Sequence, residues 1–466
     1  MWNRLVLTAG SDAQKQAFHE QIFDIPTGKF TEAVEIVTDE APEGVRIGSG
    51  GATLGIIRRI LDDVKDRDNL KVLLIHSGGL SQRMPHQSAY GKVFGMMPNG
   101  KTLLETKLEI YKDDLLAELP PIGGIMISAS DVLEDMGQLR KLNEFTGSHP
   151  DITIFVHRSS LEVGTQHGVF AMNKSTESSR ETLKKVLQKP TIEEMHREEA
   201  VDVFGTVLTD SCYFMTWQFC ERLLENNLLR EPVTEELCCY GDFMRPMGTE
   251  PKLDYIQSTS PKLTAYRKAL ADAFKTATIQ ISNLGSDSFF HFGTYQELID
   301  HLHPQSKFRR RLRRLFQSNV INSPGFSTQN VPETSFVEFS TGQFVEVGSR
   351  CVISGIAAED LKLKIPDGTV IFTMALKSKK FVSIMFKIDE DIKKKSDRVR
   401  WNGYDTGIER KSLWNAPLFG VFETRIKSVE ATMNEWTKGL SDIVRVIRER
   451  PINEDEISVD EASIDQ

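Results

Sequence analysis

The feature that most constrains the fold of this 466-residue chain is an alternation, from Arg4 to about Asp300, of short apolar runs with stretches of helical character. The apolar run "RLVLTA" precedes the helical "QKQAFHEQIF", and the runs "KVLLIHS", "LPPIGGIMIS" and "DITIFVHR" follow. This alternation predicts an α/β fold with a mostly parallel sheet covered by helices. In such sheets ligands bind at the carboxyl ends of the strands, so residues that follow the apolar runs are the first site candidates.

A second region begins at about Asn319, where the composition changes. The stretches "SFVEFSTGQFVEVGSRCVISGI" and "LKLKIPDGTVIFTMALKSKKFVSIMFKI" are rich in Val, Ile, Phe and Thr and contain Gly or Pro-Asp-Gly turns, as in β domains. The acidic stretch "NEDEISVDEASIDQ" is typical of a disordered tail. We therefore predict an α/β domain over residues 1–318, a β domain over 319–448 and a tail over 449–466.

The bulk composition excludes several classes of protein. A formal net charge of −9 opposes nucleic-acid binding, which demands a basic surface. The five cysteines show no CxxC spacing, so neither a disulfide framework nor a structural zinc site is indicated. No run approaches the roughly 20 apolar residues of a membrane span, and the first apolar stretch is too short for a signal peptide. These features predict a soluble, cytoplasmic protein, and they leave its oligomeric state open.

The stretch "IHSGGLSQRMPHQSAYGKVF" has the properties of an anion-binding loop. Gly78 and Gly79 allow the backbone to approach a ligand closely, while Arg83 and Lys92 supply positive charge. The loop lacks the second glycine and the Ser or Thr of a Walker motif. A phosphate-binding role therefore requires support from elsewhere in the chain.

A second glycine cluster lies in "VRIGSGGATLGIIRRILDD", where Gly48, Gly50 and Gly51 precede apolar residues at helical spacing. A glycine turn that leads into a helix permits close ligand approach. Thr53 occupies the third glycine position of the dinucleotide fingerprint, so that motif is broken. A plain tight turn explains the cluster equally well.

A carboxylate follows the apolar strand expected in "IMISASDVLED". Asp131 ends this strand, and we expect Glu134 and Asp135 in the first turn of a following helix. Because Mg²⁺ prefers one or two carboxylates together with phosphate oxygens, Asp131 beside a phosphate loop suits a metal ligand. Alternatively, Asp131 caps the following helix, and the two roles can coexist.

Two further residues are individually unremarkable. Lys189 in "VLQKPT" fits a surface turn, and Asp242 in "CYGDFMRPMG" fits a turn or a cap. The chain lacks the GxSxG, HExxH and kinase HRD and DFG motifs, and no Cys-His pairing has a catalytic signature. The absence of these motifs favours a reaction that needs no activated protein nucleophile. Phosphoryl or nucleotidyl transfer to an anionic acceptor is such a reaction.

Together these motifs resemble the fucose-1-phosphate guanylyltransferase family, also called the GDP-L-fucose pyrophosphorylases. The resemblance runs from residue 5 to about residue 419, and the segment from Gly78 to Lys92 is its most specific part. The matching stretches are "VLTAGSDAQKQAF", "RIGSGGATL", "HSGGLSQRMPHQSAYGKVF", "SASDVL", "GTQHGVFAM", "VLQKP", "FHFGTYQELIDHL" and "SLWNAPLF".

The resemblance implies transfer of GMP from GTP to L-fucose 1-phosphate, with Mg²⁺, as in salvage of free fucose. It also implies a nucleotidyltransferase α/β domain followed by a left-handed β-helix. In this family Arg83 and Lys92 would act on the triphosphate and Lys189 on the sugar phosphate, while Asp131 and Asp242 would bind the metal. The nucleotide and sugar would be contacted by Gly50, Gly51, Thr53, Gly78, Gly79, Ser81 and Gly168.

Two alternatives stay open at this point. Another sugar-1-phosphate nucleotidyltransferase is one, because a phosphate loop would serve any nucleoside triphosphate. A catalytically silent homologue that binds a nucleotide sugar is the other. The joint presence of Arg83, Lys92, Asp131 and Lys189 opposes the silent homologue, since a binding module needs no metal carboxylate.

Overall fold

The computed structural model forms two compact units, each made of two stretches of chain. Unit 1 comprises Met1–Gly78 and Lys107–Phe290, and unit 2 comprises Gly79–Thr106 and His291–Gln466. The sequence predicts one boundary at residue 318, whereas this division lies at residue 290 and assigns the segment 79–106 to unit 2. The residues that the structure describes are 1–38, 44–88, 90–142, 149–173, 182–312, 316–437, 456, 457 and 459.

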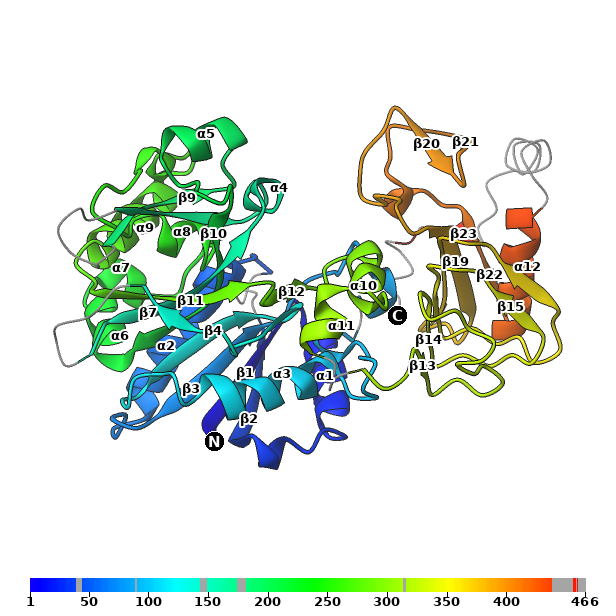
Figure 1. Cartoon of the computed structure of the whole chain (residues 1–466), viewed down its shortest axis with the longest axis horizontal. Helices are drawn as coiled ribbons and strands as arrows, with labels where there is room; N and C mark the ends of the chain where they lie inside the picture. The colour runs from blue at the N-terminus through cyan, green and yellow to red at the C-terminus, as the bar shows by residue number, and fades with distance from the viewer. Residues whose placement is uncertain are drawn as a thin grey trace. The chain divides into compact units, whose positions relative to one another are not determined.

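Unit 1 is built on one ten-stranded sheet (Figure 1). Its spatial order is β2-β1-β3-β4-β10-β7-β11-β6, and β8 pairs with β10 and β9. The strands are β1 (Trp2–Ala9), β2 (Thr31–Thr38), β3 (Lys71–His76), β4 (Gly124–Ala129), β6 (Arg140–Lys141), β7 (Ile152–Ser159), β8 (Gly168–Asn173), β9 (Thr182–Gln188), β10 (Val207–Thr216) and β11 (Ile279–Ser286). Two short strands lie outside it, β5 (Val132–Glu134) and β12 (Phe289–His291).

The sheet is mixed, which corrects the prediction of a mostly parallel one. β1 is parallel to β2 and β3, β3 is parallel to β4, and β7 is parallel to β11. In contrast, β10 runs antiparallel to both of its neighbours, β4 and β7. An apolar run indicates a buried strand but carries no information on its direction, because either direction buries the same side chains.

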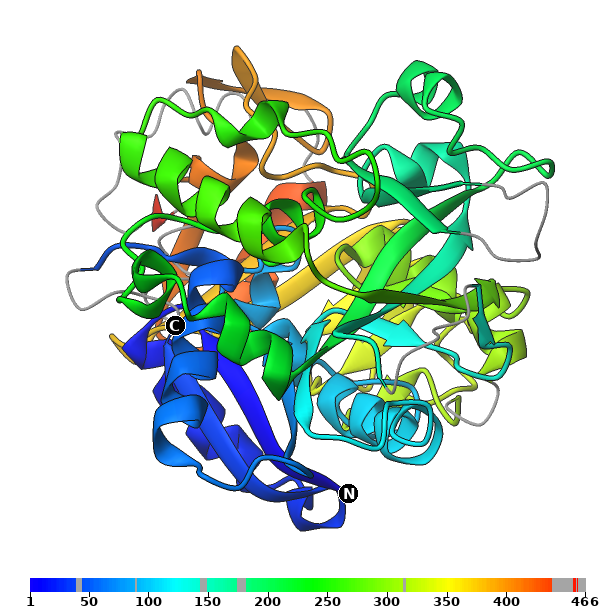
Figure 2. The same ribbon diagram turned by 90° about the vertical axis from the view of Figure 1, so that its left-hand side faces the viewer.

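Helices cover the sheet of unit 1 (Figure 2). Side chains of α2, α6, α7, α8 and α9 form one apolar core with strand residues such as Val6, Leu74 and Ile127. Ser or Thr hydroxyls accept a backbone N–H at the first turn of α1, α4, α5, α6 and α9, which explains where these helices begin. The helices are α1 (Asp12–Ile22), α2 (Gly48–Asp63), α4 (Leu161–Gly164), α5 (Ile192–Arg197), α6 (Trp217–Leu223), α7 (Asn227–Arg230), α8 (Gly241–Met244) and α9 (Pro261–Phe274). Along the chain, α3 (Leu103–Ile110) contains the boundary between residues 106 and 107.

Unit 2 contains the predicted β region. Its main sheet has the order β13-β14-β16-β18-β19-β22-β23, and β15 pairs with β17 beside it. The strands are β13 (Val320–Ile321), β14 (Phe336–Glu338), β15 (Val345–Val347), β16 (Val352–Ser354), β17 (Leu363–Ile365), β18 (Thr369–Ala375), β19 (Phe381–Lys387), β20 (Arg398–Trp401), β21 (Tyr404–Glu409), β22 (Phe419–Phe422) and β23 (Glu456–Ile457). The helices are α10 (Tyr295–Leu302), α11 (Lys307–Arg311) and α12 (Arg425–Thr437).

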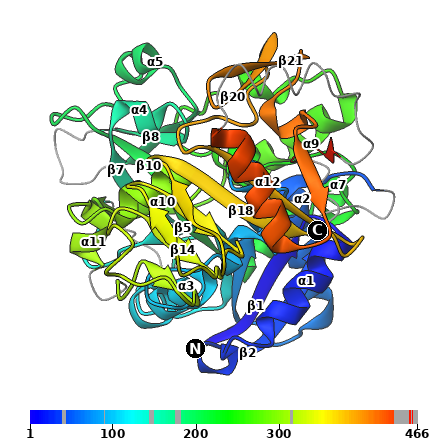
Figure 3. The same ribbon diagram turned by 90° about the vertical axis from the view of Figure 1, so that its right-hand side faces the viewer.

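The first part of unit 2 is a series of parallel coils. Val320 pairs with Val337, Phe336 with Val352, and Val352 with Val370, so successive strands are 17, 16 and 18 residues apart. From β18 onward the sheet is antiparallel, and α12 packs on β18, β19 and β22 (Figure 3). Most of the predicted tail lies outside the described residues, apart from β23, which pairs with β22.

Candidate functional site

The carboxyl ends of β1, β3 and β4 meet at one edge of the unit 1 sheet, because these strands are parallel neighbours. The Thr8 hydroxyl oxygen accepts hydrogen bonds from the backbone N–H groups of Ser77 at 3.1 Å and Gly78 at 3.3 Å. The Ser130 N–H donates to the carbonyl of His76 at 3.1 Å. These bonds fix the chain on both sides of the predicted ligand positions Gly78 and Asp131.

Asp131 lies half-buried in the tight turn between β4 and β5. The expected helix after Asp131 is absent from this described stretch, and Val132–Glu134 form strand β5 instead. Asp131 therefore has no helix to cap there, and the capping alternative is wrong. The metal role itself remains a prediction.

A buried ion pair supports this turn. The Lys107 ammonium lies 3.0 Å from the Glu134 carboxylate and donates to the carbonyl of Val132 at 2.9 Å, and both charged side chains are fully buried. Tyr111 and Ser211 hydroxyls also donate to Glu134. The sequence predicts Glu134 in the first turn of a helix, and this prediction is wrong because Glu134 ends strand β5. Its buried charge is compensated by Lys107, 27 residues away.

The glycines at the start of α2 are required by packing. Helix α2 begins at Gly48, and the Gly50 N–H donates to the Leu237 carbonyl at 2.8 Å. A Cβ at Gly50 would lie 2.9 Å from the Leu237 Cβ, and one at Gly51 would lie 2.7 Å from the Ile47 Cβ. This close approach explains the cluster without a ligand, and contact of Gly50 and Gly51 with nucleotide remains a prediction.

Thr53 is fully buried and makes two polar contacts inside unit 1. Its hydroxyl donates to the Ser49 carbonyl at 2.8 Å and lies 3.0 Å from Nε2 of His76. Burial lowers the pKa of His76 to about 4, so this imidazole is neutral at pH 7. No local pattern indicates His76, because a lone histidine at the end of an apolar run belongs to no motif.

Gly168 begins β8, and its N–H donates to the Asp210 carboxylate at 2.8 Å. Nδ1 of His167 lies 3.7 Å from the same carboxylate oxygen. The register of β10 against β7 shifts between Asp210 and Cys212, and such bulges often redirect side chains beside active sites. Asp210 was missed by sequence reasoning, although a carboxylate within an apolar strand is a detectable signal.

Lys189 lies directly after β9 with an exposed side chain and a left-handed backbone, φ +48°. Its N–H donates to the His167 carbonyl at 3.0 Å. A non-glycine residue in this conformation costs of order 1 kcal/mol, and such strain concentrates at functional sites. The surface turn expected from the sequence is present, and its backbone is held in one conformation next to Gly168 and Asp210.

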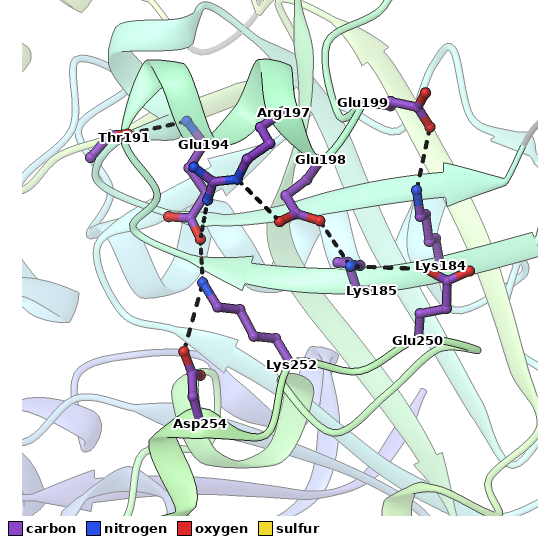
Figure 4. A network of polar contacts seen from close by, with 10 residues as sticks. All are labelled: Lys184, Lys185, Thr191, Glu194, Arg197, Glu198, Glu199, Glu250, Lys252 and Asp254. Atoms are coloured by element: carbon purple, nitrogen blue, oxygen red, sulfur yellow. Dashed lines mark hydrogen bonds and ion pairs between the residues drawn. The ribbon is translucent and has the colours of Figure 1, made fainter.

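An ionic network fixes the segments on both sides of Lys189 (Figure 4). Lys185 on β9 pairs with Glu198 at 2.8 Å, and Lys184 pairs with Glu199 at 3.3 Å, which ties β9 to the end of α5. Lys252 bridges Glu194 and Asp254. The Lys185 and Glu198 side chains are less than one-fifth exposed, so this pair is better shielded from solvent than an ordinary surface pair.

The buried histidine His157 gives unit 1 a testable pH dependence. His157 stacks on Phe289 with ring centroids 4.1 Å apart, and burial lowers its pKa to about 3. Below about pH 6.5 this histidine is protonated in the unfolded chain but stays neutral in the folded protein. The free energy of unfolding therefore falls as the pH decreases from about 6.5 toward 3, by up to ~1.4 kcal/mol per pH unit. We expect His157→Gln to lose less melting temperature between pH 7 and pH 5 than the wild type. His19→Gln, at an exposed histidine, is the control, and parallel losses in all three proteins would contradict the prediction.

Both carboxylate oxygens of Asp242 accept hydrogen bonds from other groups of the protein. Its Oδ1 accepts from Nε of Arg267 at 2.9 Å, and its Oδ2 accepts from the Cys238 N–H at 2.8 Å. The side chain is buried, and the cation of Arg267 compensates its charge. These contacts anchor the start of α8 and make Asp131 the better candidate for a metal ligand.

In unit 2 the predicted phosphate loop has an unusual backbone. Gly79 has φ +125°, and nothing lies within 4 Å of a Cβ built there, so its conformation and not packing requires glycine. Ser81 is also left-handed, with φ +46°. Arg83 is exposed and has no ion-pair partner among the residues the structure describes. Its charge is therefore available to an anion.

Lys92 is half-buried in unit 2. It begins a 3-10 helix (Lys92–Phe94) after Gly91, whose φ is +74°. Its ammonium donates to the Gly293 carbonyl at 3.3 Å. This bond orients the Lys92 side chain within unit 2.

No helix in the described part of the chain is long and apolar enough to span a membrane. Among the same residues, no group of three or more His, Cys, Asp or Glu side chains is arranged to hold a metal ion.

The chain is similar to a family of known proteins. A family model described as the fucose pyrophosphorylase domain matches residues 65–424. The fucose-1-phosphate guanylyltransferase of Mus musculus is 28% identical over 447 residues, covering 84% of this chain and 75% of its own. Its Homo sapiens counterpart is 28% identical over 451 residues, with 84% and 73% covered. The L-fucokinase/L-fucose-1-P guanylyltransferase of Bacteroides fragilis is 25% identical over 385 residues, which cover 76% of this chain and 37% of that longer protein.

Proposed function

Because the chain belongs to the fucose pyrophosphorylase family, we propose that it transfers GMP from GTP to L-fucose 1-phosphate and releases GDP-L-fucose and pyrophosphate. The observation that carries this proposal is the family match over residues 65–424, which contains Arg83, Lys92, Asp131 and Lys189. A sugar phosphate has a second pKa of about 6 and is largely dianionic at neutral pH, so it needs no activation as a nucleophile. The protein has to position the reactants and neutralise charge.

The proposed roles follow the charge and exposure of each side chain. Arg83 and Lys92 lie on the loop of unit 2 and would bind the triphosphate of GTP. Lys189 in unit 1 is exposed on a fixed backbone and would bind the phosphate of the sugar. Gly168 beside it would approach the base or the sugar.

Magnesium is the proposed cofactor, and Asp131 fits it. Its carboxylate follows a buried strand and lies on a turn fixed by the Lys107–Glu134 pair, so a ligand at this position would be held rigidly, as Mg²⁺ requires. Bound Mg²⁺ supplies charge neutralisation between the phosphates. Asp242 fits less well, because Arg267 and a backbone N–H already occupy its oxygens.

The fold of unit 2 is proposed to include a left-handed β-helix. Its parallel strands, 16 to 18 residues apart along the chain, support a coiled arrangement of this kind. The proposed location is the cytoplasm, which fits five cysteines that are all unpaired.

Substrate choice is the direct test of the proposal. We expect GTP with fucose 1-phosphate to give the fastest pyrophosphate release in a matrix of four nucleoside triphosphates and several sugar 1-phosphates. A clear preference for UTP or glucose 1-phosphate would identify a different sugar nucleotidyltransferase. Nucleotide-sugar binding without turnover of any pair would identify a silent homologue.

A further inference from the structure

Unit 2 contains a buried His–Glu pair that joins the phosphate loop to the β coils. His86, in the loop, is 4% exposed, and Glu338, at the end of β14, is 2% exposed. Nε2 of His86 lies 3.3 Å from Oε1 of Glu338. The other ring nitrogen, Nδ1, is hydrogen-bonded to the hydroxyl of Tyr295 on α10. Both polar atoms of the imidazole are therefore used by residues more than 200 positions away in the sequence.

Glu338 is fixed by the coil that follows it. The Ser354 hydroxyl on β16 donates to Oε1 of Glu338 at 2.9 Å, and the two residues are paired partners in the parallel sheet. Tyr90 also lies near this carboxylate. Burial raises the pKa of the Tyr90 hydroxyl, and the negative charge of Glu338 raises it further. The carboxylate thus contacts the loop on one side and the sheet on the other.

The same side chains surround Lys92. A small cavity within unit 2 is lined by His86, Lys92, Glu338, Phe336 and Leu298, among others. The loop has little regular structure of its own, apart from the 3-10 helices Pro85–Gln87 and Lys92–Phe94. Its geometry therefore depends on side-chain anchors, and His86 is the buried anchor between Arg83 and Lys92.

We propose that Glu338 is a positioning residue for the reaction: through His86 it holds the loop so that Arg83 and Lys92 are arranged to bind the triphosphate. Burying a carboxylate is costly unless partners compensate it, and here the partners are a loop histidine and a serine of the next coil. A binding loop needs such support because its charged side chains must be held close to their working geometry before the ligand arrives. The inference rests on the proposed function, and it makes the β coils a necessary part of nucleotide binding.

The test compares Glu338→Gln and His86→Asn with wild-type full-length protein. We expect each variant to raise KM for GTP about tenfold and to leave KM for fucose 1-phosphate within twofold, because Lys189 is untouched. Limited trypsin cleavage at the Lys92–Val93 bond should be about tenfold faster, since Val93 is fully buried when the loop is held. The double variant should raise KM for GTP no more than the more severe single variant does, because the two residues act through one contact.

Ser335→Ala is the matched control in the same coils. Ser335 is fully buried, and its hydroxyl donates to the Gly348 carbonyl and accepts from the Cys351 N–H, so its loss weakens the coils without touching the loop. If Ser335→Ala raises KM for GTP as much as Glu338→Gln does at equal loss of melting temperature, Glu338 is merely structural and the inference is overturned.

Lys92→Ala separates this inference from the proposed function. If Lys92→Ala raises KM for GTP while Glu338→Gln changes neither KM nor trypsin cleavage, only the positioning role is overturned. If Lys92→Ala and Arg83→Ala both bind GTP normally, the loop does not bind the triphosphate. The positioning role and the roles proposed for Arg83 and Lys92 then fail together, whereas the substrate matrix alone decides whether the protein transfers GMP.

Discussion

Lys92→Ala is expected to lower turnover by about 10²-fold or more while the protein stays folded. The loss corresponds to removal of one preorganised charge from a site where negative charge must be stabilised. Little stability should be lost, because Lys92 is only half-buried and its hydrogen bond to the Gly293 carbonyl is long, at 3.3 Å. Pyrophosphate release at saturating GTP and fucose 1-phosphate measures the effect, and a thermal melt measures the fold.

Lys101→Ala is the matched control for this prediction. Lys101 is a half-buried lysine of the same segment of unit 2, so its removal causes the same change of charge on that unit. We expect the control to keep turnover within about threefold of the wild type. A Lys92→Ala protein that melts many degrees lower but keeps its specific activity would show that Lys92 is structural.

Asp131→Asn is expected to abolish most turnover and to weaken its dependence on Mg²⁺. A triphosphate and a sugar phosphate repel each other strongly, and two or three basic side chains leave much of this repulsion uncompensated. A divalent ion bound by a carboxylate reduces it, whereas the amide of Asn lacks the charge. Because Asn also suits a tight turn, the turn between β4 and β5 and the melting temperature should be preserved.

The measurement is a magnesium titration of pyrophosphate release, with Asp242→Asn as the contrasting variant. Asp242→Asn weakens the ion pair to Arg267, so we expect it to lower the melting temperature while it keeps the magnesium dependence of the wild type. Full activity of Asp131→Asn at limiting Mg²⁺ would place the metal ligand elsewhere, and an altered magnesium dependence of Asp242→Asn would then point to Asp242.

Much of the catalytic architecture is predictable from local sequence. The alternation of apolar and helical segments predicts an α/β sheet, and the residues after the apolar runs include Gly78 and Asp131, which the structure places at one edge of that sheet. The change of composition near Asn319 predicts the β region of unit 2. These features are local, since a strand, a turn or a change of composition is encoded within a few residues.

Local patterns misassign residues whose partners are distant. The sequence predicts Glu134 in a first helical turn, but Glu134 lies in strand β5 and pairs with Lys107 inside the core. The glycine cluster at the start of α2 fits either a ligand contact or a tight turn, and the sequence does not show that close packing against Leu237 requires a glycine at Gly50. In each case the deciding contact joins residues 27 to about 190 positions apart, which no local pattern contains.

By itself the sequence determined the alternation of strands and helices in unit 1, the β region of unit 2 and, through its motifs, the family. Only the tertiary structure decided the antiparallel direction of β10, the position of Asp210 beside Gly168, and the inclusion of the segment 79–106 in unit 2. The physical reason is that burial and charge compensation are properties of pairs. His86 becomes an anchor of the phosphate loop because folding brings Glu338 and Tyr295 to its two ring nitrogens.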